Sequence, residues 1–133
     1  DVSFSRARFT DEATGGHMIP GSLDRVVSGA LTVEPAKRVF GSIRLRHFGP
    51  RPFVEDASVR SESTTIWNGE IGYGVTNRTR LTLEVFNLLD SRVSDIDYFY
   101  TSRLPGEPLG GVDDIHLHPS LPRAARVTLQ VSF

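Results

Sequence analysis

The sequence predicts an all-β chain, an antiparallel meander of about six long strands of the kind found in transmembrane β-barrels. Polar and apolar residues alternate along six stretches, and no stretch has a helical period of useful length. The connections run long, short, long, short, long, so a meander would place all short turns at one edge and all long loops at the other. The stretches approach the roughly 9–11 residues that a tilted strand needs to cross a bilayer.

The first three predicted strands are separated by one long loop and one tight turn. A short strand is expected over 2–9, followed by a polar, glycine-containing loop over 10–22. The second strand covers 25–34 and has small and β-branched residues in alternation. It stops at Pro35-Ala36-Lys37, which predicts a tight turn before the third strand over 39–48.

The middle of the chain repeats this arrangement. A second long loop starts at Gly49-Pro50-Arg51-Pro52 and runs to about Ser63. The fourth strand follows over 65–76, and Asn77-Arg78-Thr79 predicts the next short turn. The fifth strand covers 80–86, where three apolar residues alternate with polar ones.

The last part of the chain contains the longest connection and the clearest strand. The alternation allows the fifth strand to continue through Asn87-Leu88-Leu89-Asp90 to Tyr100, before a third long loop over 103–121 that is rich in proline and glycine. Residues 126–133 then alternate without a break. One side of this closing strand carries Val127, Leu129, Val131 and Phe133, and the other carries Arg126, Thr128, Gln130 and Ser132.

The six strands together give two faces of opposite character. The predicted apolar face carries Leu31, Val33, Ile43, Leu45, Ile71, Leu81, Leu83, Leu129 and Val131. The predicted polar face carries Ser28, Arg44, Arg46, Asn68, Glu70, Thr82, Glu84, Arg126 and Gln130. A lipid-facing outside and a hydrated lumen produce this division, and so does a soluble sheet with one face on a core. The loop asymmetry favours the barrel.

Composition excludes several classes of protein. The net charge of the 133 residues is −1, which gives no reason to expect a nucleic-acid partner. The chain has no cysteine, so it has neither a disulfide framework nor a thiolate metal site. It has no apolar run long enough for a transmembrane helix. Lys37 is the only lysine among 15 basic residues, and arginine is the better cation for fixed, hydrogen-bonded pairs.

Several motifs together resemble the carboxy-terminal barrel segment of TonB-dependent outer-membrane receptors. The motifs are Arg46-His47-Phe48-Gly49-Pro50-Arg51-Pro52, Val85-Phe86-Asn87-Leu88-Leu89-Asp90, Leu104-Pro105-Gly106-Glu107-Pro108, Gly111-Val112-Asp113-Asp114-Ile115-His116 and Val127-Thr128-Leu129-Gln130-Val131-Ser132-Phe133. The Phe-Asn-Leu-Leu-Asp segment is similar to the family's Asn-Leu-Phe-Asp element, with Leu89 where an aromatic residue is common. The resemblance covers residues 1–133.

The resemblance implies a part in a much larger molecule. Such receptors have a barrel of about 22 strands, a plug domain and a TonB-contacting segment. They lie in the outer membrane of Gram-negative bacteria and take up scarce solutes such as metal chelates, cobalamin or glycans. The chain would then be a barrel fragment whose partners are outer-membrane lipid, the rest of the barrel and plug, TonB through the missing amino-terminal part, and the barrel assembly machinery. Phe133 would resemble the signal that this machinery reads.

Two groups of residues are candidates for a functional role. Asp113, Asp114, His116 and His118 lie in the third long loop, where oxygen and imidazole groups suit a transition metal or a metal chelate. Solvated turn residues in a hydrophilic outer loop are the simpler interpretation. Arg44, Arg46, Glu70 and Glu84 lie on the polar faces of three consecutive strands, which predicts a structural ladder of arginine–carboxylate contacts facing the lumen.

No sequence motif predicts catalysis. The chain has no Gly-x-Ser-x-Gly elbow and no Walker or dinucleotide-binding glycine loop. We therefore expect a non-enzymatic protein without a cofactor. The alternative to the receptor is a soluble β-sandwich or barrel that binds glycan or protein through its long loops.

Overall fold

The computed structural model describes residues 1–13, 15–36 and 38–133, and the regular elements of these residues are all β-strands. The strands are β1 (Val2–Phe4), β2 (Arg8–Ala13), β3 (Gly16–Met18), β4 (Arg25–Ala36), β5 (Val39–Phe48), β6 (Thr64–Gly74), β7 (Thr79–Phe86), β8 (Ser94–Ser102), β9 (Val112–Pro119) and β10 (Ala124–Val131). Every pairing between them is antiparallel. The prediction of an all-β, antiparallel chain is confirmed. Among the described residues, no helix has the length and apolar character needed to cross a membrane.

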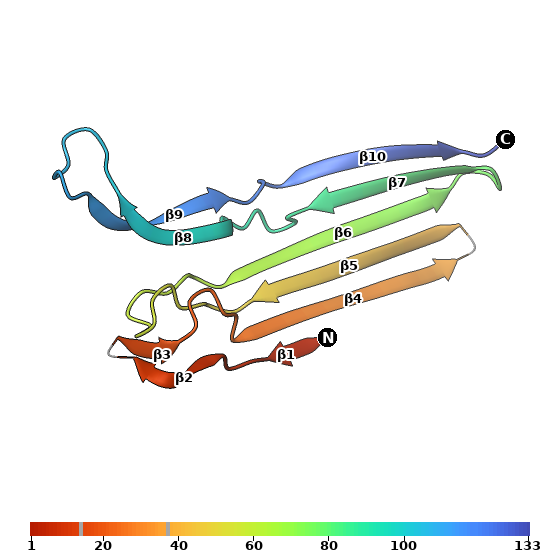
Figure 1. The fold of residues 1–133 in the computed structure, drawn as a ribbon. Helices are drawn as coiled ribbons and strands as arrows, with labels where there is room; N and C mark the ends of the chain where they lie inside the picture. Colours follow the sequence, from red (N-terminus) through yellow and green to blue (C-terminus); the bar gives the residue numbers. More distant parts are fainter. Residues whose placement is uncertain (14, 37) are drawn as a thin grey trace.

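Six strands form one sheet in the order β1-β4-β5-β6-β7-β10 (Figure 1). These are the six strands that the alternation predicts, although β1 ends at Phe4 and is much shorter than the expected 2–9. The short turns follow β4 and β6, and the long connections lie at the other end of the sheet. Of the expected turn over 35–37, Lys37 lies outside the described residues. Within the described residues no sheet closes into a barrel, and β1 and β10 form the two edges.

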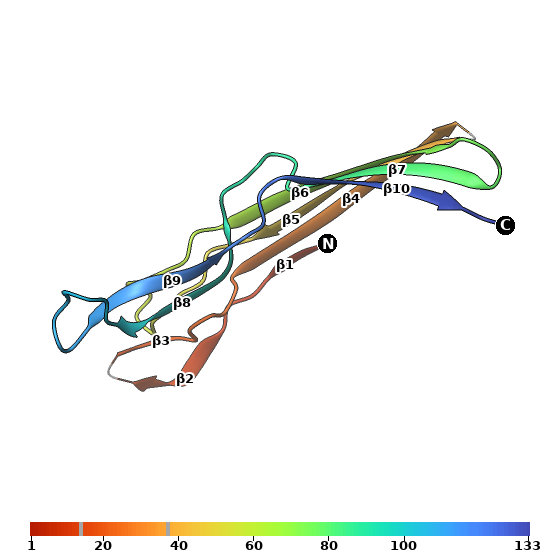
Figure 2. The same cartoon turned by 90° about the horizontal axis from the view of Figure 1, so that it is seen from above.

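The strand register assembles the apolar face. Leu31 is paired with Ile43, Ile71 with Leu83, and Leu83 with Val127 on its other side. Paired residues of an antiparallel sheet lie on the same face, so one apolar surface extends from β4 to β10. Its side chains are exposed, with 64% of the surface of Leu31 and 68% of that of Val127 accessible. Figure 2 shows the sheet as a single layer.

Two further hairpins extend beyond the long-loop end of the sheet. β2 pairs with β3, and β8 pairs with β9. Both lie at the same end of the molecule (Figures 1 and 2). The long connections therefore contain regular structure of their own, which makes this end of the molecule more ordered than its glycine and proline content suggests.

Three predictions about these connections are wrong. The expected loop over 10–22 contains most of β2 and all of β3, and Thr14 within it lies outside the described residues. The fifth strand does not continue to Tyr100, because β7 ends at Phe86 and β8 starts at Ser94. The expected loop over 103–121 contains β9. In each case pairing with a neighbouring segment stabilises a strand that the local composition disfavours.

The second long loop, over 49–63, packs against the first hairpin. Pro52 is fully buried and forms an isolated bridge with Arg60. The backbone N–H of Met18 donates to the Glu55 carbonyl at 2.9 Å, and the N–H of Gly21 donates to the Pro52 carbonyl at 2.8 Å. An ion pair of 3.1 Å joins Arg60 to Asp24, just before β4. These contacts fix the loop at the long-loop end of the sheet.

A candidate ligand pocket between the long loops

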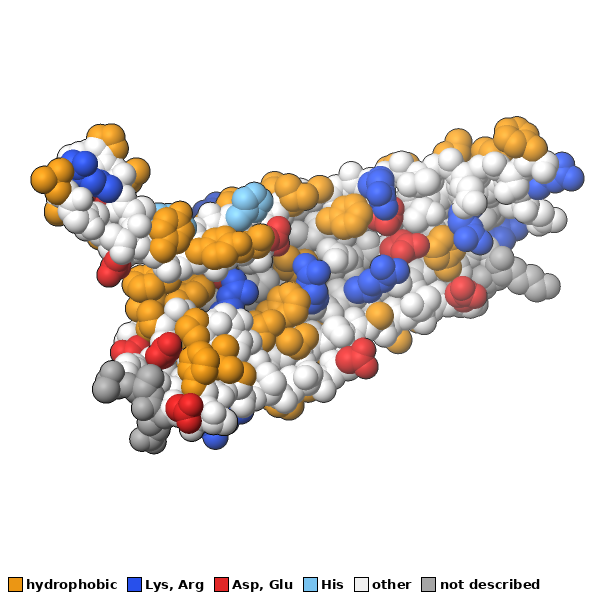
Figure 3. Space-filling view, viewed as in Figure 1, with side chains coloured by type: hydrophobic (Ala, Val, Ile, Leu, Met, Phe, Trp, Pro, Cys, Tyr) orange, Lys and Arg blue, Asp and Glu red, His pale blue; other side chains and the backbone are white. Residues whose placement is uncertain are grey.

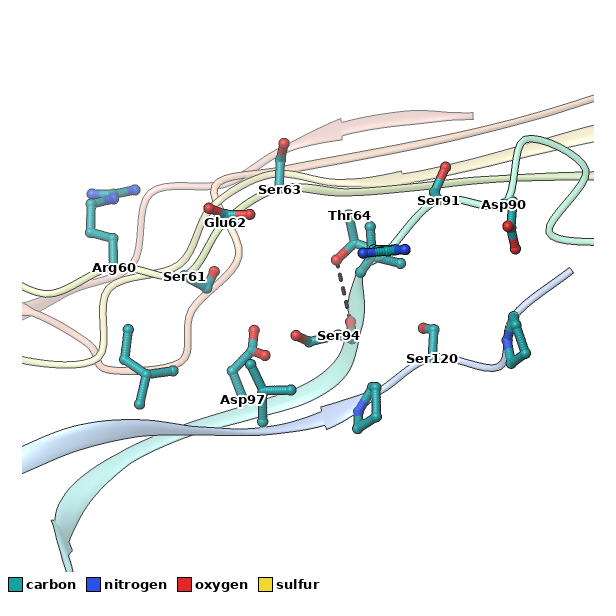
Figure 4. Close-up of a pocket in the computed structure, with 16 residues that line it drawn as sticks. Arg60, Ser61, Glu62, Ser63, Thr64, Asp90, Ser91, Ser94, Asp97 and Ser120 are labelled. Atoms are coloured by element: carbon teal, nitrogen blue, oxygen red, sulfur yellow. Dashed lines mark hydrogen bonds between the residues drawn. The ribbon is translucent and has the colours of Figure 1, made fainter.

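A cavity lies between the segment that leads into β6 and the β8–β9 hairpin (Figure 4). Its volume is about 710 Å³, within the range of small-molecule sites. One side consists of residues 60–64, the other of β8 and β9, and residues 90–93 and 120–122 form the end nearest the sheet. Three connections that lie far apart in the sequence therefore build one site.

Hydroxyl groups dominate the polar lining of this pocket. They belong to Ser61, Ser63, Thr64, Ser91, Ser94 and Ser120. Thr64 donates to the Ser94 carbonyl at 3.4 Å, the Ser61 hydroxyl accepts from the Arg51 N–H at 3.0 Å, and the Ser120 hydroxyl donates to the Asp95 carboxylate. A hydroxyl group both donates and accepts, so this lining suits a solute with many polar groups.

Charged side chains of both signs and an apolar wall complete the pocket. The charged residues are Arg60, Glu62, Asp90, Arg92 and Asp97, and the apolar wall consists mainly of Ile115, Leu117, Pro119 and Pro122. The carboxylates outnumber the guanidinium groups by one. Figure 4 shows Ser61 and Glu62 on one side of the space and Asp97 and Ser120 on the other, while Thr64 and Ser94 meet through a hydrogen bond. A bound molecule would therefore contact both sides.

One buried amide fixes the end of the pocket nearest the sheet. Asn87 follows β7, has a φ of 48° and is only 4% exposed. Its side-chain nitrogen donates to the carbonyls of Ser91 at 3.0 Å and Leu121 at 3.1 Å, and its oxygen accepts from the Ser91 N–H at 2.9 Å. Its own N–H donates to the Asn68 side chain at 3.0 Å. Asn87 thus connects the end of β7 to the segments before β8 and β10.

The far end of the pocket is held by an ion pair. Arg51, in the second long loop, lies 3.4 Å from the Asp97 carboxylate of β8. Its guanidinium also donates to the Asp97 backbone carbonyl at 3.5 Å. Both side chains are largely buried, with 24% and 13% of their surface accessible. The pair therefore orients an acidic group of the pocket and links the loop to the hairpin.

In a nearby turn, the carboxyl group of Asp56 has a shifted pKa, and among the described residues it is the one such group outside the sheet. The Asp56 carboxylate accepts from the Ser58 N–H at 2.9 Å and from the Ser58 hydroxyl at 2.7 Å. These two bonds lower the pKa of Asp56 because they favour its charged form, and the bond from the Ser58 backbone N–H has the larger effect. Asp56 is fully exposed to solvent and does not line the pocket.

The four predicted outer-loop residues are on β9 and do not form one group. Asp114, His116 and His118 share a face, whereas Asp113 lies on the other face and accepts a hydrogen bond of 2.5 Å from Thr101. The strand conformation, which replaces the expected loop, separates Asp113 from the other three residues. Among the described residues, no three His, Asp or Glu side chains are placed to hold a metal ion. Whether these residues contact a ligand stays a prediction.

His116 takes part in an aromatic contact. Its ring stacks on that of Tyr100, with centroids 3.9 Å apart and planes inclined by 16°. The Nε2 atom of His116 is buried and has no hydrogen-bond partner among the described residues. Tyr98 and Tyr100 on the same face are about half exposed, which gives the hairpin an aromatic outer surface.

The predicted ladder residues all lie on the face opposite to the apolar one, because Arg44 pairs in register with Asn68, and Glu70 with Glu84. Arg44 lies 3.7 Å from Glu70, and Glu84 accepts two hydrogen bonds of 2.7 and 2.9 Å from Arg126. Charged side chains gather over the middle of this face in Figure 3. The assignment of this face to a lumen stays a prediction.

Arg46 differs from the other ladder residues, since its guanidinium lies over the ring of Phe48 at 5.5 Å. Two more arginines of the same face lie over phenylalanine rings, Arg80 over Phe40 and Arg126 over Phe86. Phe133 follows β10 and is fully exposed.

Comparison with known proteins finds no family model, no curated protein and no solved structure that matches this chain. The function is therefore argued from the fold and the pocket.

Sequence reasoning missed the pocket. Its serines are scattered over three connections, and no fixed spacing relates them. The one local signal is Asn87, which the resemblance singled out as part of a motif and which the structure places at the junction of these connections.

Proposed function

We propose that the chain is the carboxy-terminal part of the barrel of a TonB-dependent receptor in the outer membrane of a Gram-negative bacterium. In this role it takes part in the energy-coupled uptake of a scarce solute, a metal chelate, cobalamin or a glycan. It contributes barrel wall, lumen surface and outer loops, and its partners are outer-membrane lipid, the remaining barrel and plug, TonB and the barrel assembly machinery.

One observation carries the proposal: a single sheet of six strands exposes a continuous apolar face. In a soluble sandwich, a second sheet would cover such a face. In a membrane barrel, the same face contacts lipid, while the face with Arg44, Glu70, Glu84 and Arg126 lines a hydrated lumen. The open edges β1 and β10 would pair with the strands of the rest of the barrel.

The loop arrangement supports the same orientation. The turns after β4 and β6 are short, as periplasmic turns are, and the long connections with their hairpins lie at the opposite end, as extracellular loops do. The hydroxyl-lined pocket is at this outer end, where a solute would arrive. Its excess of carboxylates favours a neutral or cationic solute with several hydroxyl or amide groups over a strongly anionic one.

Surface labelling of single cysteines tests the topology. Leu109 is at the tip of the β8–β9 hairpin and is 89% exposed, whereas Asn77 is in a short turn. The chain itself has no cysteine, so Leu109→Cys and Asn77→Cys add one thiol each to the full-length receptor. A membrane-impermeant maleimide should label Leu109→Cys on intact cells, and Asn77→Cys only after permeabilisation of the outer membrane. The unsubstituted receptor gives the background.

Equal labelling of both variants on intact cells, or recovery of the protein in the soluble fraction, would refute the membrane orientation and favour a soluble module. Uptake is tested separately. Solute accumulation should stop when TonB is absent, and accumulation that persists without TonB would remove energy coupling from the proposal.

A further inference from the structure

The charged side chains that line the pocket differ in whether they have a partner. Arg60 lies 3.1 Å from Asp24, and Asp97 lies 3.4 Å from Arg51. Neither Asp24 nor Arg51 lines the pocket. The charges of Arg60 and Asp97 are therefore neutralised by groups of the protein, and a bound molecule does not have to neutralise them.

Two charges of opposite sign remain. Among the residues that the structure describes, neither Glu62 nor Arg92 forms an ion pair. Both line the pocket, Glu62 in the segment that leads into β6 and Arg92 in the segment before β8. Asp90, the remaining carboxylate of the lining, accepts a hydrogen bond of 2.9 Å from the Arg123 N–H. The lining thus presents one carboxylate and one guanidinium group that a ligand can neutralise.

These two groups lie in different parts of the pocket. Figure 4 shows Glu62 on the side of the space opposite Asp97 and Ser120, whereas Arg92 belongs to the residues at the end nearest the sheet. A guanidinium group binds a carboxylate through two parallel N–H donors, and a carboxylate accepts hydrogen bonds from an ammonium group. Charge complementarity therefore favours a ligand that has an anionic group and a cationic group at separate positions.

The uncharged part of the lining suits the middle of a peptide. Hydroxyl groups such as those of Ser91 and Ser94 can accept from an amide N–H or donate to an amide carbonyl. Ile115 and Leu117 of β9 have exposed apolar surface on which small aliphatic side chains can pack. The lining contains no aromatic side chain that could pack against the face of a sugar ring. A cavity of about 710 Å³ has room for several residues of peptide.

We propose that the pocket binds a short zwitterionic peptide, with the peptide's carboxylate on Arg92 and its ammonium group on Glu62. The inference rests on the proposed function, because it names the class of solute that the same pocket takes. It narrows that solute to a molecule with a peptide part, such as a metal chelate built on a short peptide, and it disfavours a neutral glycan.

Calorimetric titration with alanine peptides tests the two charged contacts one at a time. The protein is kept at pH 7 in micelles of a polyoxyethylene detergent, whose headgroup has neither a charge nor a sugar ring. The probes are trialanine, its carboxy-terminal amide and its N-acetyl derivative, and maltotriose is the uncharged probe. Each derivative lacks one charge of trialanine and should bind about tenfold more weakly, as expected for the loss of one hydrogen bond between charged groups.

Two variants assign the charges to residues. Arg92→Gln should weaken the binding of trialanine about tenfold and leave that of the amide unchanged, because the amide has no carboxylate for Arg92. Glu62→Gln should weaken the binding of trialanine by a similar factor and leave that of the N-acetyl derivative unchanged. Arg103→Gln, at the exposed tip of the β8–β9 hairpin, is the matched control and should bind all three peptides like the unsubstituted protein. Far-UV circular dichroism checks that each variant keeps its β-sheet.

Three results would overturn the peptide ligand: no binding of trialanine, binding of maltotriose as tight as that of trialanine, or an Arg92→Gln variant that loses the same factor for trialanine and for its amide. These results leave the membrane orientation untouched, because the cysteine labelling tests it separately. Conversely, peptide binding together with equal labelling at positions 77 and 109 would overturn the receptor function but not the ligand. The two failures are therefore distinguishable.

Discussion

At the scale of single residues, Asn87 stabilises the end of a strand and Phe40 stabilises the middle of the sheet. Asn87 satisfies the backbone groups of Ser91 and Leu121 from one buried position. Phe40 performs a different role, since its ring covers Gly72 on the neighbouring strand so closely that a Cβ atom there would lie 1.9 Å from the ring. Aromatic cover of a strand glycine protects the backbone and compensates for its missing side chain.

Replacement of Asn87 should destabilise the protein strongly. Asn87→Ala leaves the Ser91 N–H and the carbonyls of Ser91 and Leu121 without their partner and places alanine at positive φ. The expected loss is about 2–4 kcal/mol in the free energy of unfolding, measured by urea titration of the protein in detergent micelles.

The exposed Asn77 in the short turn gives the matched control, because Asn77→Ala should change the free energy of unfolding by less than about 0.5 kcal/mol. Asn87→Asp keeps the acceptor for the Ser91 N–H but loses both donated bonds, so it should fall between the two. Equal stability of Asn87→Ala and Asn77→Ala would contradict the role of this amide.

At the scale of elements, the sequence predicts the sheet well and the hairpins poorly. Along the six sheet strands apolar residues recur at alternate positions, and the register places most of them on one face, with Phe40 and Ile66 among the exceptions. β9 has two adjacent aspartates and two histidines and ends at a proline, a composition typical of a loop. Its strand conformation comes from pairing with β8, and this stabilisation by a partner strand is not visible in the composition of the segment itself.

The pocket has the same origin, since it exists only where the second long loop meets the β8–β9 hairpin. The Arg44–Glu70 contact of the ladder was easier to predict than the pocket, because the spacing of the strands alone placed these two residues on neighbouring strands. The contacts of the other two ladder residues were not predicted. Glu84 binds Arg126 of the closing strand β10. Arg46 packs on the ring of Phe48 and does not bind a carboxylate of the ladder.

The link between the loop and the hairpin should control the mobility of the hairpin. Arg51→Ala removes the ion pair with Asp97, and backbone amides of β8 and β9 should exchange with deuterium about 2–5 times faster, as expected for a pair worth about 0.5–1 kcal/mol. Amides of β4 to β7 should not change. Arg103→Ala at the exposed tip of the same hairpin is the control, and equally fast exchange in both variants would disprove the link.

At the scale of the whole molecule, the sheet exposes many apolar side chains and buries few of them. Among the described residues, Ile66 is the one buried hydrophobic residue of the sheet, while Leu31, Val127 and Leu129 are exposed. A sheet of this kind depends on its surroundings for stability, because apolar burial is the main favourable contribution to folding. The two open edges add unpaired backbone groups.

The 133-residue chain should therefore not be monomeric in detergent-free buffer. We expect aggregates in analytical ultracentrifugation, and a shift to smaller species when detergent covers the apolar face. The same chain at a detergent concentration above the critical micelle concentration serves as the reference. A monodisperse monomer without detergent would count against the membrane interpretation and favour the soluble binding module.

The β8–β9 hairpin also has a consequence for the order of folding. β7 and β10 pair across residues 87–123, the longest connection of the sheet, and each doubling of a loop adds about 0.6 kcal/mol to the entropic barrier of its closure. The hairpin closes locally within microseconds and brings Ser94 next to Pro119. The remaining loop is then only residues 87–93 and 120–123. The hairpin thus shortens the search by which β10 finds β7, so that the closing strand reaches the sheet quickly even though it is distant in sequence.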